Sequence, residues 1–354
     1  MSTIDCAPGK SRKKLSFLDR FLTLWIFLAM LLGVSLGNIF PEIPKWSEEI
    51  SYGSTNIPLA VGLILMMYPP LVKVQFSKVP KVFAKTKLML VSFFVTWVIG
   101  PFLMFILAIT FLADYPEYMT GLIIIGLAPC IAMVIVWNEL ASGNRELVAG
   151  LVGINSLLQV FFFGLYAWFY LEVVLPAFGF EALAIDITIT DIATTVGIYL
   201  GLPFVSALVT RYAVLKWKGE EWLNSYLIPK ISPITLISLL FTIVFMFSLK
   251  GAMIAAIPLD VLRVALPLVF FFGVMFFLMF ILGKWAGASY EDNAALSFTA
   301  SGNNFELAIA VSIGVFGINS GQAFAGVIGP LVEVPALILM VQIAYWLKSK
   351  WYKS

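Results

Sequence analysis

Residues 126–144, GLAPCIAMVIVWNELASGN, are apolar enough to lie in a membrane, yet they contain Pro129 and Cys130 side by side. A proline inside a helix lacks an N–H donor and clashes with the preceding turn, so this helix should kink or unwind there. Unwound backbone is tolerated inside a bilayer only where protein or a water-filled cavity covers it. The stretch therefore predicts a broken membrane helix whose break faces the protein interior.

The composition of the whole chain is typical of a polytopic membrane protein. The chain has 354 residues, of which 61% are hydrophobic and 12% charged, and its apolar residues fall in runs of about twenty, the length of helix that crosses a bilayer. The sequence predicts ten spanning segments: residues 17–40, 56–72, 88–111, 119–140, 146–175, 191–213, 231–249, 261–283, 294–317 and 322–347.

The Lys and Arg residues indicate the orientation, because positive charge near the ends of a span resists translocation. With a cytoplasmic N-terminus, all 22 of them except Lys45, Lys250 and Arg263 fall on the cytoplasmic side. We therefore expect a multi-pass protein of the plasma membrane with both termini cytoplasmic. Topology accounts for the basic residues, so we expect no nucleic-acid partner. Cys6 and Cys130 lie in different environments, which argues against a disulfide between them.

The two halves of the chain resemble each other. FLMFIL occurs at 102–107 and again at 277–282, and VAGLVG at 148–153 corresponds to FAGVIG at 324–329, at offsets of 175 and 176. A repeat of five spans must enter the membrane from the opposite side the second time, as in many secondary transporters. The predicted fold is thus all-α, with ten transmembrane helices in two inverted five-helix repeats. Its parts are a tail at 1–16, repeats at 17–178 and 179–347, and a tail at 348–354.

The ninth segment should be broken like the fourth. It contains Ser301, Gly302, Asn303 and Asn304 in a row, which are poor helix formers and good partners for freed backbone groups. At the repeat offset, Cys130 corresponds to residue 305 or 306. We therefore expect the two breaks to cross in the interior and to form the substrate site.

Two residue types at these breaks suggest chemistry. A buried cysteine is often a small hydrophobic residue, but the N-terminus of a half-helix favours a thiolate, and a soft sulfur suits a thiophilic substrate. Carboxyl groups near span centres, Glu306 and Glu333, usually mark an ion path or a substrate site. Their alternative role is that of a neutral acid bonded to a freed backbone group. Trp137, on nearly the same helix face as Cys130, would wall the site.

On these residues the sequence resembles the arsenite efflux permeases, within the superfamily of bile-acid, arsenite and riboflavin transporters. The resemblance covers nearly the whole chain and rests on residues 126–144, on SGNNFELAIAVSIGVFG and on GPLVEVPALI. It implies a panel domain and a core domain, with export of arsenite, and sometimes antimonite, driven by the proton gradient. The functional residues that it implies are Cys130, Trp137, Asn155, Asn304, Glu306 and Glu333; Cys6 matches no family motif.

The hypothesis is that Cys130 binds arsenite at the crossing, while Asn304 and Glu306 hydrogen-bond the arsenite oxygens. Because the chain has no histidine, Glu306 and Glu333 are the candidates for proton coupling. No cofactor is expected, and an ATPase partner is left open. The first alternative is a sodium-coupled organic-anion carrier with Glu306 and the asparagines as cation ligands. The others are a passive channel for arsenite or small polyols and a membrane enzyme, which the absence of histidine and of a nucleophile–base or metal motif disfavours.

Overall fold

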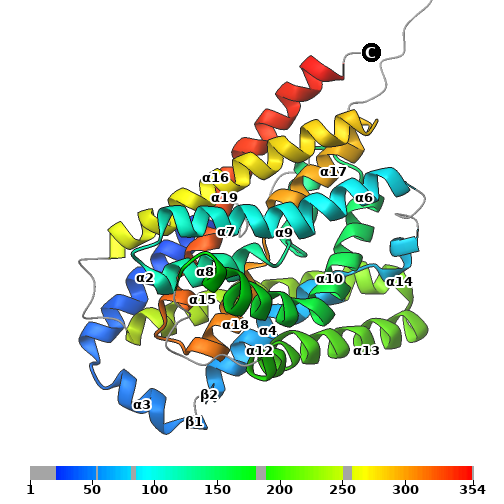
Figure 1. Ribbon diagram of the computed structural model, residues 1–354. Coiled ribbons are helices and arrows are strands. Elements are labelled where there is room, and N and C mark those ends of the chain that lie inside the picture. The colour runs from blue at the N-terminus through cyan, green and yellow to red at the C-terminus, as the bar shows by residue number, and fades with distance from the viewer. Residues whose placement is uncertain (1–20, 53–54, 81–84, 181–188, 250–256, 353–354) are drawn as a thin grey trace, which may run out of the picture.

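Helices make up almost all of the computed structural model, which describes residues 21–52, 55–80, 85–180, 189–249 and 257–352 (Figure 1). The predicted N-terminal tail with Cys6, the cation Lys250 and the last two residues of the chain lie outside the described residues.

A helix lies in every apolar segment that the sequence predicts. In chain order these are α2 (Leu22–Ile39), α4 (Ile57–Lys73), α6, η2 and α7 (Thr86–Phe94, Val95–Ile99, Gly100–Phe111), α8 and α9 (Pro116–Gly126, Met133–Leu140), α10, η3 and α11 (Arg145–Trp168, Phe169–Val174, Leu175–Ala177), α12, η4 and α13 (Ile189–Val196, Gly197–Gly201, Leu202–Trp217), α14, η5 and α15 (Gly219–Trp222, Leu223–Leu227, Ile228–Leu249), α16 (Ile257–Trp285), α17 and α18 (Tyr290–Ser301, Phe305–Phe316) and α19 (Gly321–Trp351).

Several of these helices are long and apolar enough to cross a membrane. In the described part of the chain there are six such stretches: Thr86–Phe111, Arg145–Ala177, Ile192–Trp217, Gly219–Leu249, Pro258–Trp285 and Gly321–Trp351. Shorter apolar helices lie at Leu24–Ile39, Ile57–Lys73 and Phe305–Phe316. The prediction of a multi-pass, all-helical membrane protein is confirmed at this level.

One helix boundary and several short elements differ from the prediction. The seventh helical stretch begins at Gly219 rather than at residue 231, because α14, η5 and α15 follow one another without a gap. Between α2 and α4 lie α3 (Ile43–Glu49) and a small antiparallel hairpin, in which β1 (Ser51–Tyr52) pairs with β2 (Thr55–Asn56). After α4 comes η1 (Phe76–Lys78). Sequence periodicity identifies long apolar helices, and these short elements carry no such signal.

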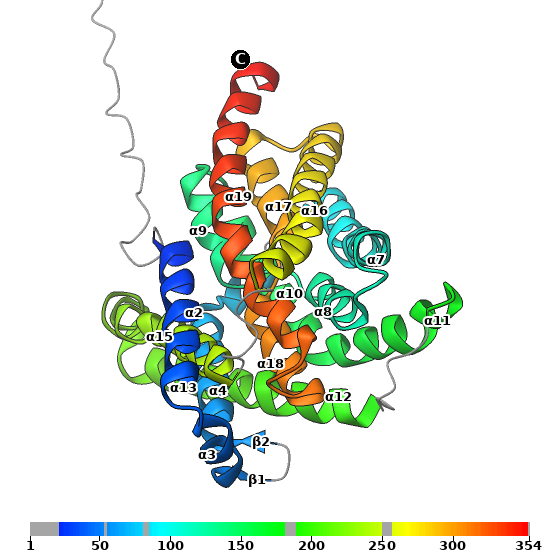
Figure 2. The same ribbon diagram turned by 90° about the vertical axis from the view of Figure 1, so that its left-hand side faces the viewer.

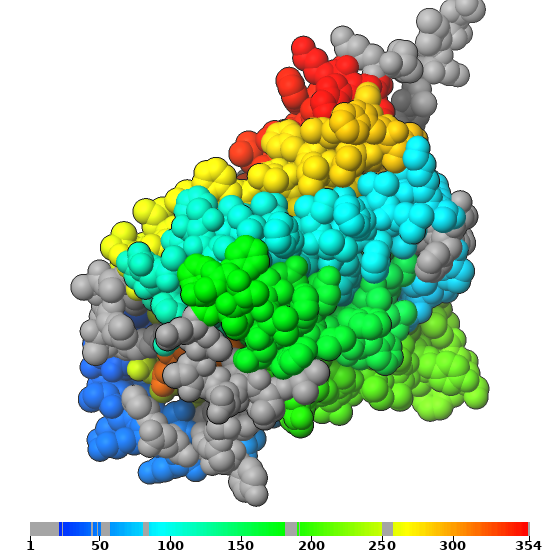
Figure 3. Space-filling view, in the orientation of Figure 1, coloured from blue at the N-terminus to red at the C-terminus, as the bar shows by residue number. Residues whose placement is uncertain are grey.

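The outer surface is apolar. Figure 3 shows a face to which α6, α7, α10 and α16 contribute. On these helices Phe102, Phe161 and Phe270 are each about half exposed or more. An apolar surface of this extent marks a membrane-facing region rather than a water-facing one. The side chains on this face therefore lie against lipid.

The helices pack as two groups. Helix α15 packs on α2 and on α4, and α4 packs on α13. Figure 2 shows this group on one side of α7, α16 and α17, with α2 next to α19. The interrupted pairs α8/α9 and α17/α18 belong to the second group, while α18 also touches α4 and α12. The breaks therefore lie in the interior, beside the boundary between the two helix groups.

Close packing within the first group depends on glycine. Gly33 and Gly37 lie four residues apart on α2, and a Cβ at Gly37 would lie 2.3 Å from the backbone oxygen of Ser248 on α15. A Cβ at Gly33 would lie 2.5 Å from the backbone oxygen of Val244. Small residues at this spacing let two membrane helices approach to backbone contact.

Gly37→Ala should therefore destabilise the protein, by about 1–3 kcal/mol, because the added methyl group meets backbone that cannot rotate away. Thermal unfolding in detergent would show a lower Tm. The control is Gly197→Ala, since a Cβ at Gly197 meets nothing within 4 Å. Equal Tm values for the two variants would contradict backbone contact between α2 and α15.

Candidate functional site

The two helix breaks pair with each other through their backbones. Pro129 and Asn303 form an isolated antiparallel bridge. The N–H of Cys130 donates to the carbonyl of Gly302 at 2.9 Å, and the N–H of Asn304 donates to the carbonyl of Ala128 at 2.8 Å. In this bridge neither Pro129 nor Asn303 has to donate, so the proline loses nothing by lacking an N–H. Each break therefore supplies hydrogen-bond partners for backbone groups of the other break.

Side chains satisfy the remaining helix ends at the crossing. Asn303 Nδ2 donates to the carbonyl of Ile125 at the end of α8, at 3.0 Å, and Asn304 Oδ1 accepts from the N–H of Leu307 at the start of α18, at 3.1 Å. Asn304 Nδ2 also donates to Oε1 of Gln159 at 2.7 Å, and Gln159 Nε2 donates to the carbonyl of Pro129 at 2.6 Å. The asparagines thus hold the break together.

The bridge gives a residue correspondence. Cys130 follows the bridge residue Pro129 and donates to the other break, and Asn304 follows the bridge residue Asn303 and donates in the same way. Cys130 and Asn304 therefore occupy equivalent positions in the two breaks. The repeat offset places the counterpart of Cys130 at residue 305 or 306 instead. The offsets of 175 and 176 relate helices on either side of the breaks, whereas the bridge relates residues inside the breaks, where the chain is not helical.

Cys130, Gly302 and Glu333 form a tight cluster. A Cβ at Gly302 would lie 2.9 Å from Cβ of Cys130 and 3.2 Å from Oε1 of Glu333, so the thiol-bearing carbon and the carboxylate flank one point. Cys130 lies three residues before Met133, where α9 begins. Cys130 is 2% exposed. The thiol predicted from sequence therefore lies beside an acid, at a helix N-terminus.

Glu333 is a buried acid on a proline-flanked turn. Pro330 and Pro335 lie inside α19 on either side of it, and its side chain is 3% exposed. Its Oε1 has no hydrogen-bond partner among the described residues. A buried oxygen in that state is costly unless a proton, an ion or a substrate satisfies it.

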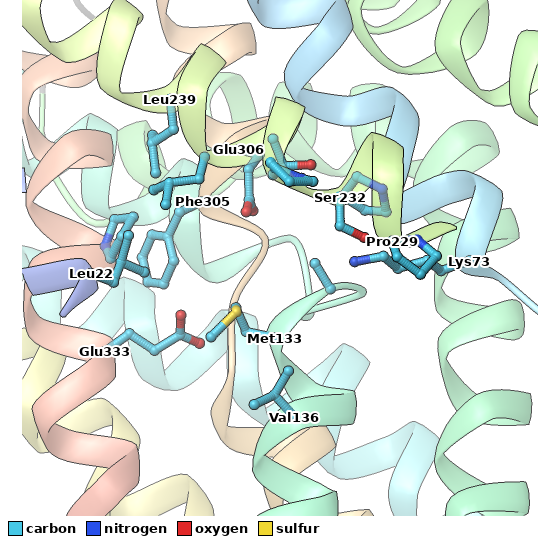
Figure 4. Close-up of a pocket in the computed structure, with 16 residues that line it drawn as sticks. Leu22, Lys73, Met133, Val136, Pro229, Ser232, Leu239, Phe305, Glu306 and Glu333 are labelled. Carbon is cyan, nitrogen blue, oxygen red and sulfur yellow. The ribbon is translucent and has the colours of Figure 1, made fainter. Parts of the chain in front are cut away.

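A cavity of about 380 Å³ opens beside this cluster, at the boundary between the two helix groups. Figure 4 shows the carboxyl groups of Glu306 and Glu333 and the ammonium of Lys73 pointing into the same space, with the side chain of Met133, the first residue of α9, beside Glu333. Its lining residues are Leu22, Pro70, Lys73, Ala132, Met133, Val136, Pro229, Ser232, Pro233, Thr235, Leu236, Leu239, Phe305, Glu306, Pro330 and Glu333.

The structure brings some of the predicted site residues together and separates others. Glu306 and Glu333 line the cavity, whereas Cys130 does not line it and approaches Glu333 at Gly302. Trp137 is fully buried and does not line it. Asn155 accepts a hydrogen bond from Trp97 Nε1 at 3.0 Å, and Asn304 is bonded to Gln159, so both lie within the protein scaffold.

Three residues at the site were not identified from sequence. The sequence pattern indicates only that Gly302 belongs to the break, it gives no role to Gln159, and membrane topology alone explains Lys73. Gln159 has the one detectable signal, since a fully buried glutamine on a membrane helix needs polar partners. The roles of Gly302 and Lys73 depend on contacts between segments that are far apart in the sequence, so no local pattern indicates them.

Gln159→Leu should destabilise the crossing, because it leaves the Pro129 carbonyl and Asn304 Nδ2 without a partner, at about 1–3 kcal/mol for each group. The measurement is thermal unfolding in detergent. The matched control is Gln322→Leu, since Gln322 is equally buried and its Oε1 has no partner among the described residues. A Tm loss no larger than that of Gln322→Leu would show that Gln159 does not support the crossing.

Comparison with known proteins relates this geometry to transporters. Residues 60–257 match the model of the Sodium Bile acid symporter family. The chain is 47% identical to the arsenical-resistance protein Acr3 of Corynebacterium glutamicum, over 96% of this chain and 92% of that protein. It is 34% identical to an uncharacterised transporter of Synechocystis sp. (95% and 92%) and 30% identical to the arsenical-resistance protein Acr3 of Alkaliphilus metalliredigens (94% and 93%).

These relatives span nearly the whole chain, including both helix breaks and the segment of α19 that contains Glu333. The family consists of membrane transporters, so the chain is not an enzyme, in agreement with the sequence analysis. The chain belongs to the Acr3 family of arsenical-resistance proteins, which lies within the sodium bile acid symporter family.

Proposed function

We propose that the protein exports arsenite from the cytoplasm in exchange for protons, and that antimonite is a second substrate. The observation that carries the proposal is the cluster at the crossing, where a thiol and a buried carboxyl group flank Gly302 beside a cavity that contains a second acid. The names of two relatives, which are arsenical-resistance proteins, support the same substrate class.

The proposed architecture is two inverted five-helix repeats in the cell membrane. Contacts of one half have counterparts in the other: α2 packs on α15 as α13 packs on α4, and α7 packs on α8 as α16 packs on α17. Likewise α8 contacts α19, and α17 contacts α10. In this arrangement the group of α2, α4, α13 and α15 is the panel domain, and the group with the broken helices is the core domain.

The cavity opens toward the cytoplasm in this conformation, with both termini on that side. Its lining includes Leu22 at the beginning of α2, Lys73 at the end of α4 and Pro229 at the beginning of α15. These are the ends next to the Lys-rich segments, which the positive-inside rule assigns to the cytoplasm. Arsenite would enter there, and rocking of the panel against the core would carry it outward.

Sulfur chemistry supplies the substrate selectivity. Arsenite at neutral pH is an uncharged trihydroxide of a soft element, and thiols are soft ligands. When the sulfur of Cys130 bonds to arsenic, the thiol proton and one arsenic hydroxyl leave together as water. A single sulfur makes this bond reversible. Because Cys130 is buried and does not line the cavity, the reaction requires a local movement that opens a path to its sulfur.

Coupling to protons falls to the two acids. Export of a neutral molecule gains nothing from the membrane potential unless an ion moves with it. Glu306 lines the cavity from the first turn of α18, and Glu333 lies beside Cys130. We assign the exchanged proton to Glu306 and a relay position to Glu333. Protonation of these groups on the outer side would favour release.

A second candidate function is sodium-coupled transport of an organic anion, which the name of the matched family model favours. In that reading Glu306 would be a sodium ligand. Sodium-dependent uptake that is insensitive to thiol reagents would support it over arsenite export.

Cys130→Ala should abolish arsenite accumulation in inverted membrane vesicles, down to the level of vesicles without the protein, because no sulfur remains at the crossing. Antimonite accumulation should fall in parallel. The matched control is Cys6→Ala, which removes the chain's other thiol. Normal transport by a correctly inserted Cys130→Ala variant would exclude the thiol from the mechanism.

Collapse of the pH gradient with a proton ionophore should stop uphill arsenite accumulation by the wild type. Glu306→Gln should give the same result with the gradient intact, because an amide takes up no proton in this pH range. The readout is steady-state arsenite inside the vesicles relative to outside. Accumulation that persists without a gradient would refute proton exchange.

A further inference from the structure

Helix α9 contributes to the wall of the central cavity and follows Cys130 in the chain. Ala132, Met133 and Val136 line the cavity, and Figure 4 shows the side chains of Met133 and Val136 at this wall. Cys130 is buried and does not line it. The beginning of α9 is therefore the part of the cavity wall that lies nearest to the thiol along the chain.

The C-terminal end of α9 is closed by its own backbone. The N–H of Gly143 donates to the carbonyl of Asn138 at 2.8 Å, and the N–H of Ser142 donates to the carbonyl of Glu139 at 3.1 Å. Ser142 has a φ of 56°. These are the two hydrogen bonds and the left-handed residue of a Schellman motif, which satisfies carbonyl groups at the end of a helix.

Two tyrosines from neighbouring helices hold the same end of α9. Tyr345 on α19 donates its hydroxyl to the carbonyl of Leu140 at 2.8 Å, and Tyr290 on α17 donates to the carbonyl of Ala141 at 2.9 Å. A helix end leaves four carbonyl groups without partners inside the helix. Here all four are bound, two of them by side chains of α17 and α19.

The N-terminal end of α9 lacks a side-chain cap. Ala132, the residue before the helix, has no side chain that could accept from the first backbone N–H groups. In contrast, α18, the other half-helix that begins at the crossing, is capped by Asn304. A side-chain cap stabilises the first turn of a helix. The two ends of α9 therefore differ in how firmly they are held.

The buried face of α9 carries polar atoms that its observed position leaves unpaired. Val134, Trp137 and Asn138 form this face. Trp137 Nε1 and both polar atoms of the Asn138 side chain have no hydrogen-bond partner among the described residues, and both side chains are 0% exposed. Buried polar groups without partners cost free energy, so a displacement of α9 that gives them partners or water lowers this cost.

We propose that α9 is a gate between the central cavity and Cys130, and that it pivots about the C-terminal end that Tyr290 and Tyr345 hold. The gate is closed in the observed structure. Movement of its beginning, from Ala132 to Val136, exposes the sulfur to arsenite in the cavity. The two tyrosines are positioning residues, because they act on Cys130 through α9. The inference rests on the proposed reaction of arsenite with Cys130 and adds the element that controls access to it.

The test measures how fast N-ethylmaleimide alkylates Cys130 in the purified full-length Cys6→Ala protein, the parent, by mass spectrometry. A thiol that is buried when the gate is closed reacts while the gate is open, so the rate reports the population of the open state. Asn138→Leu replaces the unpaired amide by an apolar side chain and should favour the closed gate. We expect a severalfold lower alkylation rate with a Tm at or above that of the parent. General destabilisation would lower the Tm and raise the rate.

A second pair of variants loosens the pivot. Tyr290→Phe and Tyr345→Phe each remove one hydroxyl and keep the ring, and each should raise the alkylation rate severalfold. The matched control is Tyr166→Phe, since Tyr166 donates its hydroxyl to the carbonyl of Trp97 at 2.6 Å, a bond of the same kind that does not involve α9. This control should be alkylated at the rate of the parent.

An unchanged alkylation rate in Asn138→Leu would overturn the gate. So would unchanged rates in both pivot variants, or an equal rise in Tyr166→Phe. Arsenite tests the proposed function separately, because it should slow the alkylation of Cys130 in the parent by occupying the sulfur. If the variants behave as expected but arsenite gives no protection, α9 gates the thiol and the proposed reaction with arsenite is wrong.

Discussion

The whole arrangement depends on how two interrupted membrane helices satisfy their backbone groups. A bilayer offers no water to an unpaired N–H or carbonyl, so each break must find partners in the protein. Here each finds them in the other, through the hydrogen bonds from Cys130 to Gly302 and from Asn304 to Ala128. This pairing fixes where α9 and α18 begin, and with them the position of Cys130 and Glu306.

Pairing of the breaks also explains why small and proline residues lie there. Pro129 stands at a position of the bridge that requires no donor, and its carbonyl is bound by Gln159. Gly302 has no space for a side chain, since Cys130 and Glu333 approach it from two sides. The same glycine that ends α17 therefore brings a sulfur and an acid together. The residue that the end of α17 requires is thus also the residue that lets Cys130 and Glu333 approach each other.

Much of this fold is predictable from sequence because apolar runs and helix breakers are local signals. The helical segments, the break at Pro129 and the break at Ser301–Asn304 all appear where the sequence indicates. Contacts between distant segments are not local, which is why Gln159, Gly302 and Lys73 were missed. Trp137 illustrates the same limit. Its predicted face relative to Cys130 assumes one continuous helix, but α9 begins only at Met133, beyond the break, and Trp137 is fully buried and does not line the cavity.

The charge composition of the cavity favours a neutral substrate. Two acids and one lysine line a space that is otherwise largely apolar. An organic anion entering it would meet two carboxyl groups and a single ammonium that these groups already attract. A neutral trihydroxide meets no such repulsion, since its hydroxyl groups can donate to carboxylates while its arsenic is taken by sulfur. The proposed substrate class and the proposed use of protons both rest on the side chains that line this cavity.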